Sequence, residues 1–317
     1  MLKIIEKKKR EKAIQKITGN LGFVIEKEDK LICYVQKEKC HFHEGFAVNS
    51  YVIRIEDYKK NNRDLVEKYG LDKEIVYVLD GLTFDQKEPV AINVFDNASR
   101  LEIKNCRFDC GLVINYPKEC IIKNTIINTD YLSYQCEIKA RDLILDNVDI
   151  NNNDNMPLVN KVTISAGNSI KIKNSKIKAD TCEIGNIKTK EVNIENSIFE
   201  ANREIKIEAR SLTAKLSRAI SNFEISIYTK VYDKLLGLSL DAYRIYVNEE
   251  ILQKEKTETP ISLRPLNDLD KQRKVLINRL KEIKDNFEEK RDETLIRVKE
   301  NYNSQPVGKV LLRGKDK

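Results

Sequence analysis

The sequence contains no tryptophan and only two histidines, 11 glycines, six prolines and two methionines. Without tryptophan, an aromatic platform for a sugar ring would depend on tyrosine and phenylalanine. So few glycines leave little room for loops that cradle phosphates, and no P-loop, GxGxxG, HExxH or EF-hand pattern occurs. The sequence therefore predicts no nucleotide site and no cofactor.

Long apolar runs and paired cysteines are also missing. No stretch is long enough for the core of a signal peptide or for a membrane span, and the seven cysteines form no CxxC pair. We therefore expect a reducing, cytoplasmic setting in which most cysteines are small core residues, and no membrane partner. Export by another route, or release from a lysed host cell, stays open.

The net charge of +7 is concentrated at the two ends of the 317-residue chain. Residues 1–20 contain seven Lys or Arg against two Glu, and residues 304–317 contain four against one Asp. The nearly neutral remainder lacks the basic stripe of a DNA-binding protein, so a contact with nucleic-acid phosphate would fall to the basic termini. Because 41% of the residues are apolar, a folded core is expected despite 34% charged residues.

One short pattern recurs five times. The copies are "LEIKNCRF" (Leu101–Phe108), "CIIKNTII" (Cys120–Ile127), "LILDNVDI" (Leu143–Ile150), "IKIKNSKI" (Ile170–Ile177) and "VNIENSIF" (Val192–Phe199). In each copy apolar residues stand four and two positions before an asparagine and three positions after it, which predicts a strand with one buried face. The asparagines are Asn105, Asn124, Asn147, Asn174 and Asn196, and an earlier copy, "YVLDGLTF", has Gly81 in their place.

The repeat predicts a solenoid. Asn and Gly both tolerate a left-handed backbone, so their shared position is expected to be a tight bend at the end of a strand. Spacings of 19 to 27 residues fit one coil per repeat, and the LxxLxL pattern of leucine-rich repeats is absent. Coils about 4.8 Å apart would stack the asparagines into one internal ladder, each amide bonding the next and satisfying polar groups buried at the bend.

A second phrase, "IKARDL" (Ile138–Leu143), matches "IEARSL" (Ile207–Leu212) and, more loosely, "LDAYRI" (Leu240–Ile245). A small alanine at a fixed point predicts a second strand and a cramped corner. With these features the chain resembles the right-handed parallel β-helix superfamily, which includes pectate lyases and phage tailspikes and often carries asparagine ladders. The resemblance covers somewhat more than half of the chain and implies the fold alone, since no family-specific motif accompanies it.

The expected fold is mainly β: a single-stranded parallel β-helix with an N-terminal α/β cap and a long C-terminal α-helix. We expect the cap over residues 1–74, because an open solenoid end exposes apolar side chains and strand edges. A separate binding module is the alternative for this region. The β-helix is expected over 75–255, a linker over 256–266, a helix or coiled coil over 267–303 and a basic tail over 304–317.

The helix expected over residues 267–303 contains no Pro or Gly and carries a heptad-like seam with one stutter. The seam consists of Leu269, Leu276, Leu280, Ile283, Phe287, Leu295, Val298 and Tyr302. Such a helix cannot bury its apolar stripe alone. We therefore expect self-association or a protein partner there; packing back along the solenoid flank is the other possibility.

No catalytic constellation is apparent. The β-helix carbohydrate enzymes that the chain resembles place acidic side chains of adjacent coils on the outward positions of one sheet. Here the two outward columns of the Asn strands are Lys104, Lys123, Asp146, Lys173, Glu195 and Glu102, Ile121, Ile144, Lys171, Asn193. Mixed signs one coil apart favour lateral ion pairs and do not supply the paired carboxylates of a glycosidase.

The two histidines lie in "CHFHE", Cys40–Glu44. On a strand His41 and His43 would share a face and could hold zinc with help from Glu44 or Cys33. Two ligands do not make a site, however, so we expect a polar strand edge without metal. The sequence favours a non-enzymatic scaffold or interaction protein; a carbohydrate-active enzyme or a phage-type receptor-binding spike of the same fold is the alternative.

Overall fold

The computed structural model describes residues 2–44, 49–95, 99–129, 136–152, 161–231, 236–248, 250–253 and 261–263. The helices in these ranges are α1 (Leu2–Ile17), α2 (Tyr58–Asn61), α3 (Arg63–Tyr69) and the 3-10 helix η1 (Lys37–Lys39). The strands are β1 (Gly22–Glu26), β2 (Lys30–Val35), β3 (His41–His43), β4 (Ser50–Ile55), β5 (Glu74–Asp80), β6 (Thr83–Phe84), β7 (Val90–Val94), β8 (Arg100–Lys104), β9 (Arg107–Phe108), β10 (Leu112–Asn115), β11 (Glu119–Thr129), β12 (Cys136–Asn152), β13 (Lys161–Lys173), β14 (Lys176–Gly185), β15 (Glu191–Glu195), β16 (Ile198–Ser221), β17 (Glu224–Val231), β18 (Leu236–Asp241), β19 (Arg244–Val247), β20 (Glu250–Gln253) and β21 (Ile261–Leu263).

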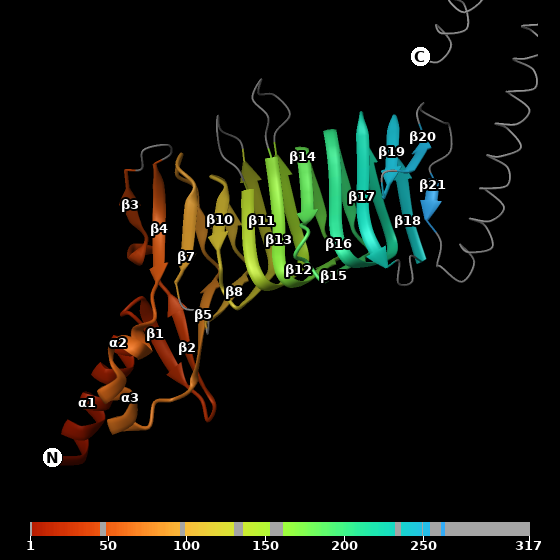
Figure 1. Ribbon diagram of the computed structural model, residues 1–317. Coiled ribbons are helices and arrows are strands. Elements are labelled where there is room, and N and C mark those ends of the chain that lie inside the picture. Colours follow the sequence, from red (N-terminus) through yellow and green to blue (C-terminus); the bar gives the residue numbers. More distant parts are fainter. Residues whose placement is uncertain are drawn as a thin grey trace, which may run out of the picture. The chain divides into compact units, whose positions relative to one another are not determined.

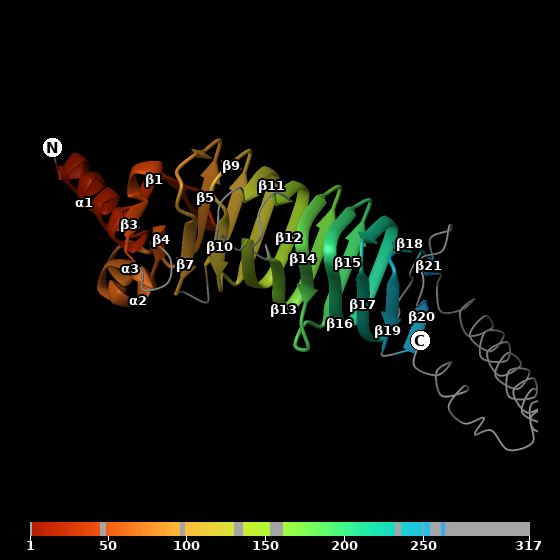
Figure 2. The same cartoon turned by 90° about the horizontal axis from the view of Figure 1, so that it is seen from above.

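Most strands pair in parallel with a strand one coil further along the chain, so the described chain is a β-solenoid (Figures 1 and 2). Three stacks of strands follow one another around each coil. Sheet A contains β2, β5, β8, 119–123, 142–146, 169–173, β15 and 211–215. Sheet B contains β6, β9, 125–129, 148–152, 176–179, 198–201, 217–220 and β18. Sheet C contains β4, β7, β10, 136–140, 161–166, 181–185, 204–209, β17 and β19.

The alternation predicted for the Asn strands is confirmed. Leu101 pairs with Cys120 and Ile103 with Ile122, and all four side chains are buried inside the coil. Side chains of successive coils also stack on one another inside the solenoid: the ring of Phe84 lies 5.0 Å from that of Phe108 in the next coil. Burying a side chain of this kind stabilises the fold by roughly 1.5–3 kcal/mol, so the inward columns are the main source of stability.

The bend from sheet A to sheet B adopts the predicted left-handed conformation. The five asparagines have φ between 48° and 56°, and Gly81 has φ 67°. The series has one further member, Leu216, with φ 48°. Its place follows Asn196 by one coil, and the sequence pattern missed it because leucine seldom adopts this conformation.

Antiparallel strands close the parallel stacks at both ends. β1 pairs with β2 and β3 with β4 at one end, while β20 pairs with β19 and β21 with β18 at the other. Strand β21, Ile261–Leu263, lies within the segment 256–266 that was expected to be a linker. Added strands of opposite direction cover edges that would otherwise recruit another chain.

The N-terminal helix and a mixed α/β cap are present. Ala13, Ile14 and Ile17 of α1 belong to the same buried core as Leu31 of β2. The turn after α1 passes through Gly19 at φ 73°, and Gly70 ends α3 at φ 59°. Helix α1 thus seals apolar side chains of the first coil from water, while β2 and β4, from the same N-terminal region, already pair in parallel with β5 and β7.

The repeated alanine motif predicts a closely packed corner between strands, and this prediction is confirmed for two of the three copies. Ala140 ends a sheet C strand, pairs with Ala166 and is buried, and Ala209 occupies the same buried corner. Ala242 instead follows β18 of sheet B, so "LDAYRI" belongs to a different corner and its alignment with the other copies is wrong. The helix expected over 267–303, its eight seam residues and the tail over 304–317 lie outside the described residues.

Candidate functional site

The asparagines of the A–B bend are joined by hydrogen bonds from coil to coil. Asn124 Nδ2 donates to Asn105 Oδ1 (3.2 Å), Asn147 to Asn124 (2.9 Å) and Asn196 to Asn174 (2.9 Å). At two places the acceptor is the aspartate that precedes the bend: Asn105 donates to Asp80 Oδ1 (2.8 Å) and Asn174 to Asp146 Oδ1 (3.2 Å). The stack is therefore an Asn/Asp ladder, in which Asp146 replaces the amide acceptor between the coils of Asn147 and Asn174.

This ladder lies on the outside of the solenoid, so the prediction of an internal ladder is wrong in its placement. All five asparagine side chains are exposed. Inward residues stand four and two positions before the asparagine, and strict alternation would turn the asparagine inward too. The left-handed residue shifts the alternation by one, so the asparagine points outward and the next residue points into the core.

The buried polar groups at the bend are satisfied by that next residue. Ser175, Ser197 and Ser217 are buried, and each hydroxyl donates to the carbonyl two residues before it (2.6–2.8 Å). Ser197 Oγ also accepts the N–H of Ser175 and Ser217 Oγ that of Ser197 (both 3.2 Å). A second, internal ladder of hydroxyl groups therefore runs beside the amide ladder. Sequence reasoning missed it because it examined the asparagine and passed over the residue after it.

One lateral ion pair in the predicted columns of sheet A is present, and another lies in the outward column beside them. Lys173 Nζ lies 3.0 Å from Glu195 of the next coil, and Arg100 lies 3.0 Å from Glu119. Both pairs are solvent-accessible, so water and salt screen them and they contribute little to stability. In these columns charge is neutralised between coils and is not concentrated for chemistry.

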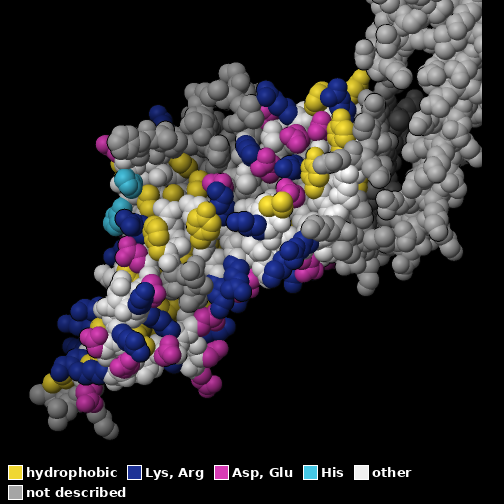
Figure 3. All heavy atoms as spheres, in the orientation of Figure 1, with side chains coloured by type: hydrophobic (Ala, Val, Ile, Leu, Met, Phe, Trp, Pro, Cys, Tyr) yellow, Lys and Arg dark blue, Asp and Glu magenta, His cyan; other side chains and the backbone are white. Residues whose placement is uncertain are grey.

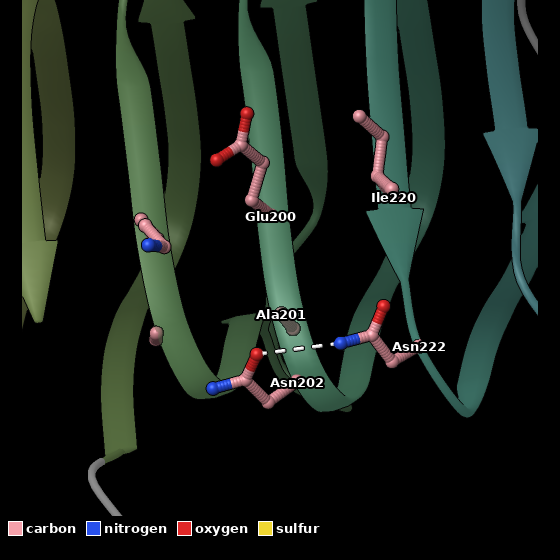
Figure 4. Close-up of a pocket in the computed structure, with 7 residues that line it drawn as sticks. Glu200, Ala201, Asn202, Ile220 and Asn222 are labelled. Atoms are coloured by element: carbon pink, nitrogen blue, oxygen red, sulfur yellow. Dashed lines mark hydrogen bonds between the residues drawn. The ribbon is translucent and has the colours of Figure 1, made fainter. Parts of the chain in front are cut away.

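The described residues form two adjoining hollows at the corner between sheets B and C, which we name the B–C groove. One, of about 340 Å³, is lined by Lys178, Ala179, Glu200, Ala201, Asn202, Ile220 and Asn222. The other, of about 700 Å³, is lined by Thr181, Asn202, Arg203, Glu204, Asn222, Phe223 and Glu224. Asn202 and Asn222 separate the two, and the amide of Asn222 donates to that of Asn202 (3.5 Å, Figure 4).

Two carboxylates of neighbouring coils face each other in this groove. Glu204 and Glu224 are paired in the sheet C register, which places their backbones about 4.8 Å apart, and both are half-buried. Burial raises the pKa of Glu204, and the charges of Glu224 and Glu183 raise it further. Two neighbouring carboxyls, one with a raised pKa, resemble the pair that glycosidases use for acid–base work on glycosidic bonds.

The groove also contains an aromatic side chain that contacts a guanidinium. The ring of Phe223 is 49% exposed and lies 4.9 Å from the guanidinium of Arg244. The sequence signal for this site is a third repeat, "NREIKI" from Asn202 and "NFEISI" from Asn222. The paired acids lie on sheet C, away from the sheet A strands that carry the Asn pattern.

The two histidines lie on β3 and are exposed. Phe42, between them, faces the other way, with its ring 5.4 Å from that of Tyr51. Within the described ranges no group of three or more His, Cys, Asp or Glu is placed to hold a metal ion. Neither Glu44 nor Cys33 therefore completes a zinc site there, and Cys33 is buried in the core.

Hydrophobic side chains gather beside these histidines, over β4 and β7 (Figure 3). Two further exposed aromatic residues follow sheet C strands: Phe95, after β7, is 59% exposed and Tyr116, after β10, is 62% exposed. Arg54 lies 5.3 Å from the ring of Phe95. Large apolar groups held in water together mark a surface suited to contact with another molecule.

Compared with models of protein families, with curated proteins and with solved structures, the chain matches none. No described helix has the length and apolar character that a membrane crossing requires. All seven cysteines carry free thiols. The solenoid and its ladders are therefore established by geometry, and the function must be argued from the surfaces described above.

Proposed function

We propose that the protein is a non-enzymatic scaffold of the right-handed parallel β-helix class, with a C-terminal arm for self-association or partner docking. The observation that carries the proposal is the division of the chain after Pro265 into two units, 1–265 and 266–317. The described core of the first unit is built from residues between Ala13 and Val247. The apolar pattern from Leu269 to Tyr302 would then serve as the partner-binding seam of the second unit.

Further features support a scaffold. The exposed aromatics Phe95 and Tyr116 offer a contact surface on the solenoid. The free thiols fit a reducing cytoplasm. Stacked coils give a scaffold whose surface is fixed by the backbone of each neighbour, so partners bound at different coils would keep a constant spacing.

The mass of the protein in solution tests the arm. A chain that ends at Pro265 keeps β21 and should retain its strand content and cooperative melting, while its oligomeric state falls below that of the full chain. In the full chain, Leu276→Lys with Leu280→Lys should lower the oligomeric state equally, because charge enters the seam. Asn278→Lys, off the seam, is the matched control. If the chain ending at Pro265 unfolds or aggregates, the arm is part of the solenoid and the proposal fails.

The B–C groove favours a second candidate function, cleavage or binding of a carbohydrate. It rests on Glu204 and Glu224, which supply the paired acids that sheet A lacks. Release of reducing ends from a panel of polysaccharides would test it. Glu204→Gln and Glu224→Gln should each abolish release, whereas Glu208→Gln, further along the same strand, should not. Absence of release with every polysaccharide, together with absence of binding to the same panel, leaves the scaffold as the single candidate.

A further inference from the structure

Strand β1 is an open edge of sheet A. Among the described residues it pairs only with β2. The N–H of Lys27 donates to Lys30 (2.8 Å) and that of Gln36 to Leu21 (3.0 Å). Because bonded pairs alternate along an antiparallel ladder, Gly22, Val24 and Glu26 direct their backbone groups away from β2. These groups are the ones that a further strand would bond.

The outward face of this edge is apolar. Phe23 is 53% exposed and stacks on Tyr34 with ring centroids 4.7 Å apart, and Ile25, opposite Ile32, is 45% exposed. A hollow of about 340 Å³ opens beside Phe23 and Tyr34 and reaches Val78 of β5. The strand itself, Gly-Phe-Val-Ile-Glu, contains neither the lysine nor the proline with which edge strands resist pairing.

The inward side of β1 is already covered by its own chain. Val24 packs against the buried core to which Ala13 and Ile14 of α1 belong, and Arg10 of α1 binds Glu26. A ligand for β1 must therefore bond the free backbone groups at the strand edge and also contact the apolar outward face. An extended strand meets both requirements.

We infer that β1 pairs antiparallel with β1 of a second copy, across a two-fold axis through Val24. Val24 then bonds the partner's Val24, and Glu26 lies opposite the partner's Gly22. Phe23 lies beside the partner's Ile25, which is placed at the rim of the hollow formed by Phe23 and Tyr34. In this register all five residues of the strand are paired.

The composition of the strand favours its own copy over another sequence. The only charged residue, Glu26, falls opposite glycine, so no like charges meet. Each Phe–Ile contact occurs twice by symmetry, and aromatic pairs with β-branched residues are among the favourable cross-strand neighbours. The same arrangement makes the contact isologous, so it closes at a dimer and does not propagate.

Disulfide trapping tests the register in the full-length protein. Phe23→Cys and Ile25→Cys are made separately, each with Cys40→Ser. Phe23 and the partner's Ile25 form a non-hydrogen-bonded pair, where side chains approach most closely, and a disulfide fits such a pair. Mild oxidation of the mixture should give a covalent dimer, and neither variant alone should. No dimer in the mixture, or a dimer from one variant alone, overturns the inference.

The native thiols give this experiment a low background. Six of the seven cysteines are buried and Cys40 is half-buried. Burial raises the pKa of Cys40 to about 11 and that of Cys33 to about 12, so few thiolates are present at neutral pH.

A charge placed on the apolar face tests the energetics. Ile25→Lys should raise the dissociation constant of the β1 dimer roughly tenfold, since both symmetric Phe–Ile contacts are lost. Ile187→Lys makes the same change at a site that is 80% exposed and serves as the control in sedimentation measurements. Equal effects of the two changes overturn the inference. The trap is independent of the C-terminal arm, because Leu276→Lys with Leu280→Lys should leave the covalent dimer intact.

Discussion

Leu216 has the backbone conformation of the ladder asparagines without their amide. Its φ is 48° and its side chain is 72% exposed, so it gains little from burial and carries the cost of a left-handed conformation. The amide ladder consequently ends at Asn196, one coil before this residue.

Leu216→Asn should therefore stabilise the protein by about 1 kcal/mol, measured by urea unfolding. The new amide can donate to Asn196 Oδ1, as Asn196 does to Asn174. Leu216→Gly removes the side chain and relieves the same conformation without adding an amide, so the difference between the two variants isolates the ladder bond. A loss of stability in Leu216→Asn would contradict the ladder alignment at this coil.

The hydroxyl of Ser197 has a larger role than any ladder asparagine. It donates to Glu195 and accepts from Ser175 inside the core. Ser197→Ala leaves the buried N–H of Ser175 without this acceptor and should lower the free energy of unfolding by about 1–3 kcal/mol. Ser197→Thr, which keeps the hydroxyl, should lose less. Equal losses would assign the effect to packing.

The spacing of apolar residues around the asparagine already indicates this internal serine ladder. Apolar residues stand at even positions before the asparagine but at the third position after it, so the change of parity was visible in "IKIKNSKI" and "VNIENSIF". A left-handed residue at the asparagine explains this change of parity, and it implies that Ser175 and Ser197 point inward. The position of Leu216 could not be predicted, because no propensity favours leucine in that conformation.

At the scale of elements, α1 is fastened to β1 by an acid-sensitive contact. Glu26 accepts from Arg10 and lies 2.8 Å from Lys73. The hydrogen bond from Arg10, with the nearby Lys73, lowers the pKa of Glu26 from 4.5 to about 2. A lowered pKa means that this contact stabilises the fold fully above pH 4.5 and is lost as the pH falls toward 2.

Glu26→Gln should reduce stability at pH 7 by on the order of 1 kcal/mol, as expected for a partly exposed ion pair. The difference from the unaltered protein should shrink as the pH falls and vanish below pH 2, where Glu26 becomes protonated in the folded state as well. Urea titrations at the two pH values, followed by helical circular dichroism, check this. Glu28→Gln, in the exposed turn between β1 and β2, should show no such dependence.

The sequence predicted the elements unevenly for a physical reason. Strands that repeat an apolar pattern around one asparagine were located correctly, because every coil repeats the same environment. The strands that end the stacks, β1, β3, β20 and β21, pair antiparallel and follow no repeat. The Glu204–Glu224 pair was not predicted for a related reason. Two residues of neighbouring coils meet only if the strand register aligns them. Because the coils differ in length, the sequence spacing alone does not show which residues are aligned.

At the scale of the whole molecule, the antiparallel end strands should decide solubility. A chain that ends at Val247 lacks β20 and β21 and exposes the edges of β19 and β18. We expect it to form concentration-dependent aggregates, seen by light scattering, while the chain that ends at Pro265 does not. If both chains stay soluble to the same concentration, the two short strands are not protective.

The pairing of each coil with its immediate neighbours has a mechanical consequence. A force applied at Val247, along the axis of the stack, would open the hydrogen bonds of the last coil one after another, because they lie along the direction of pull. The chain would unspool, and each released coil of about 22 residues would add roughly 75 Å of extended chain. The Asn/Asp ladder and the serine ladder would add to the resistance at each step, and between Asn147 and Asn174 the carboxylate of Asp146 takes the place of the amide acceptor.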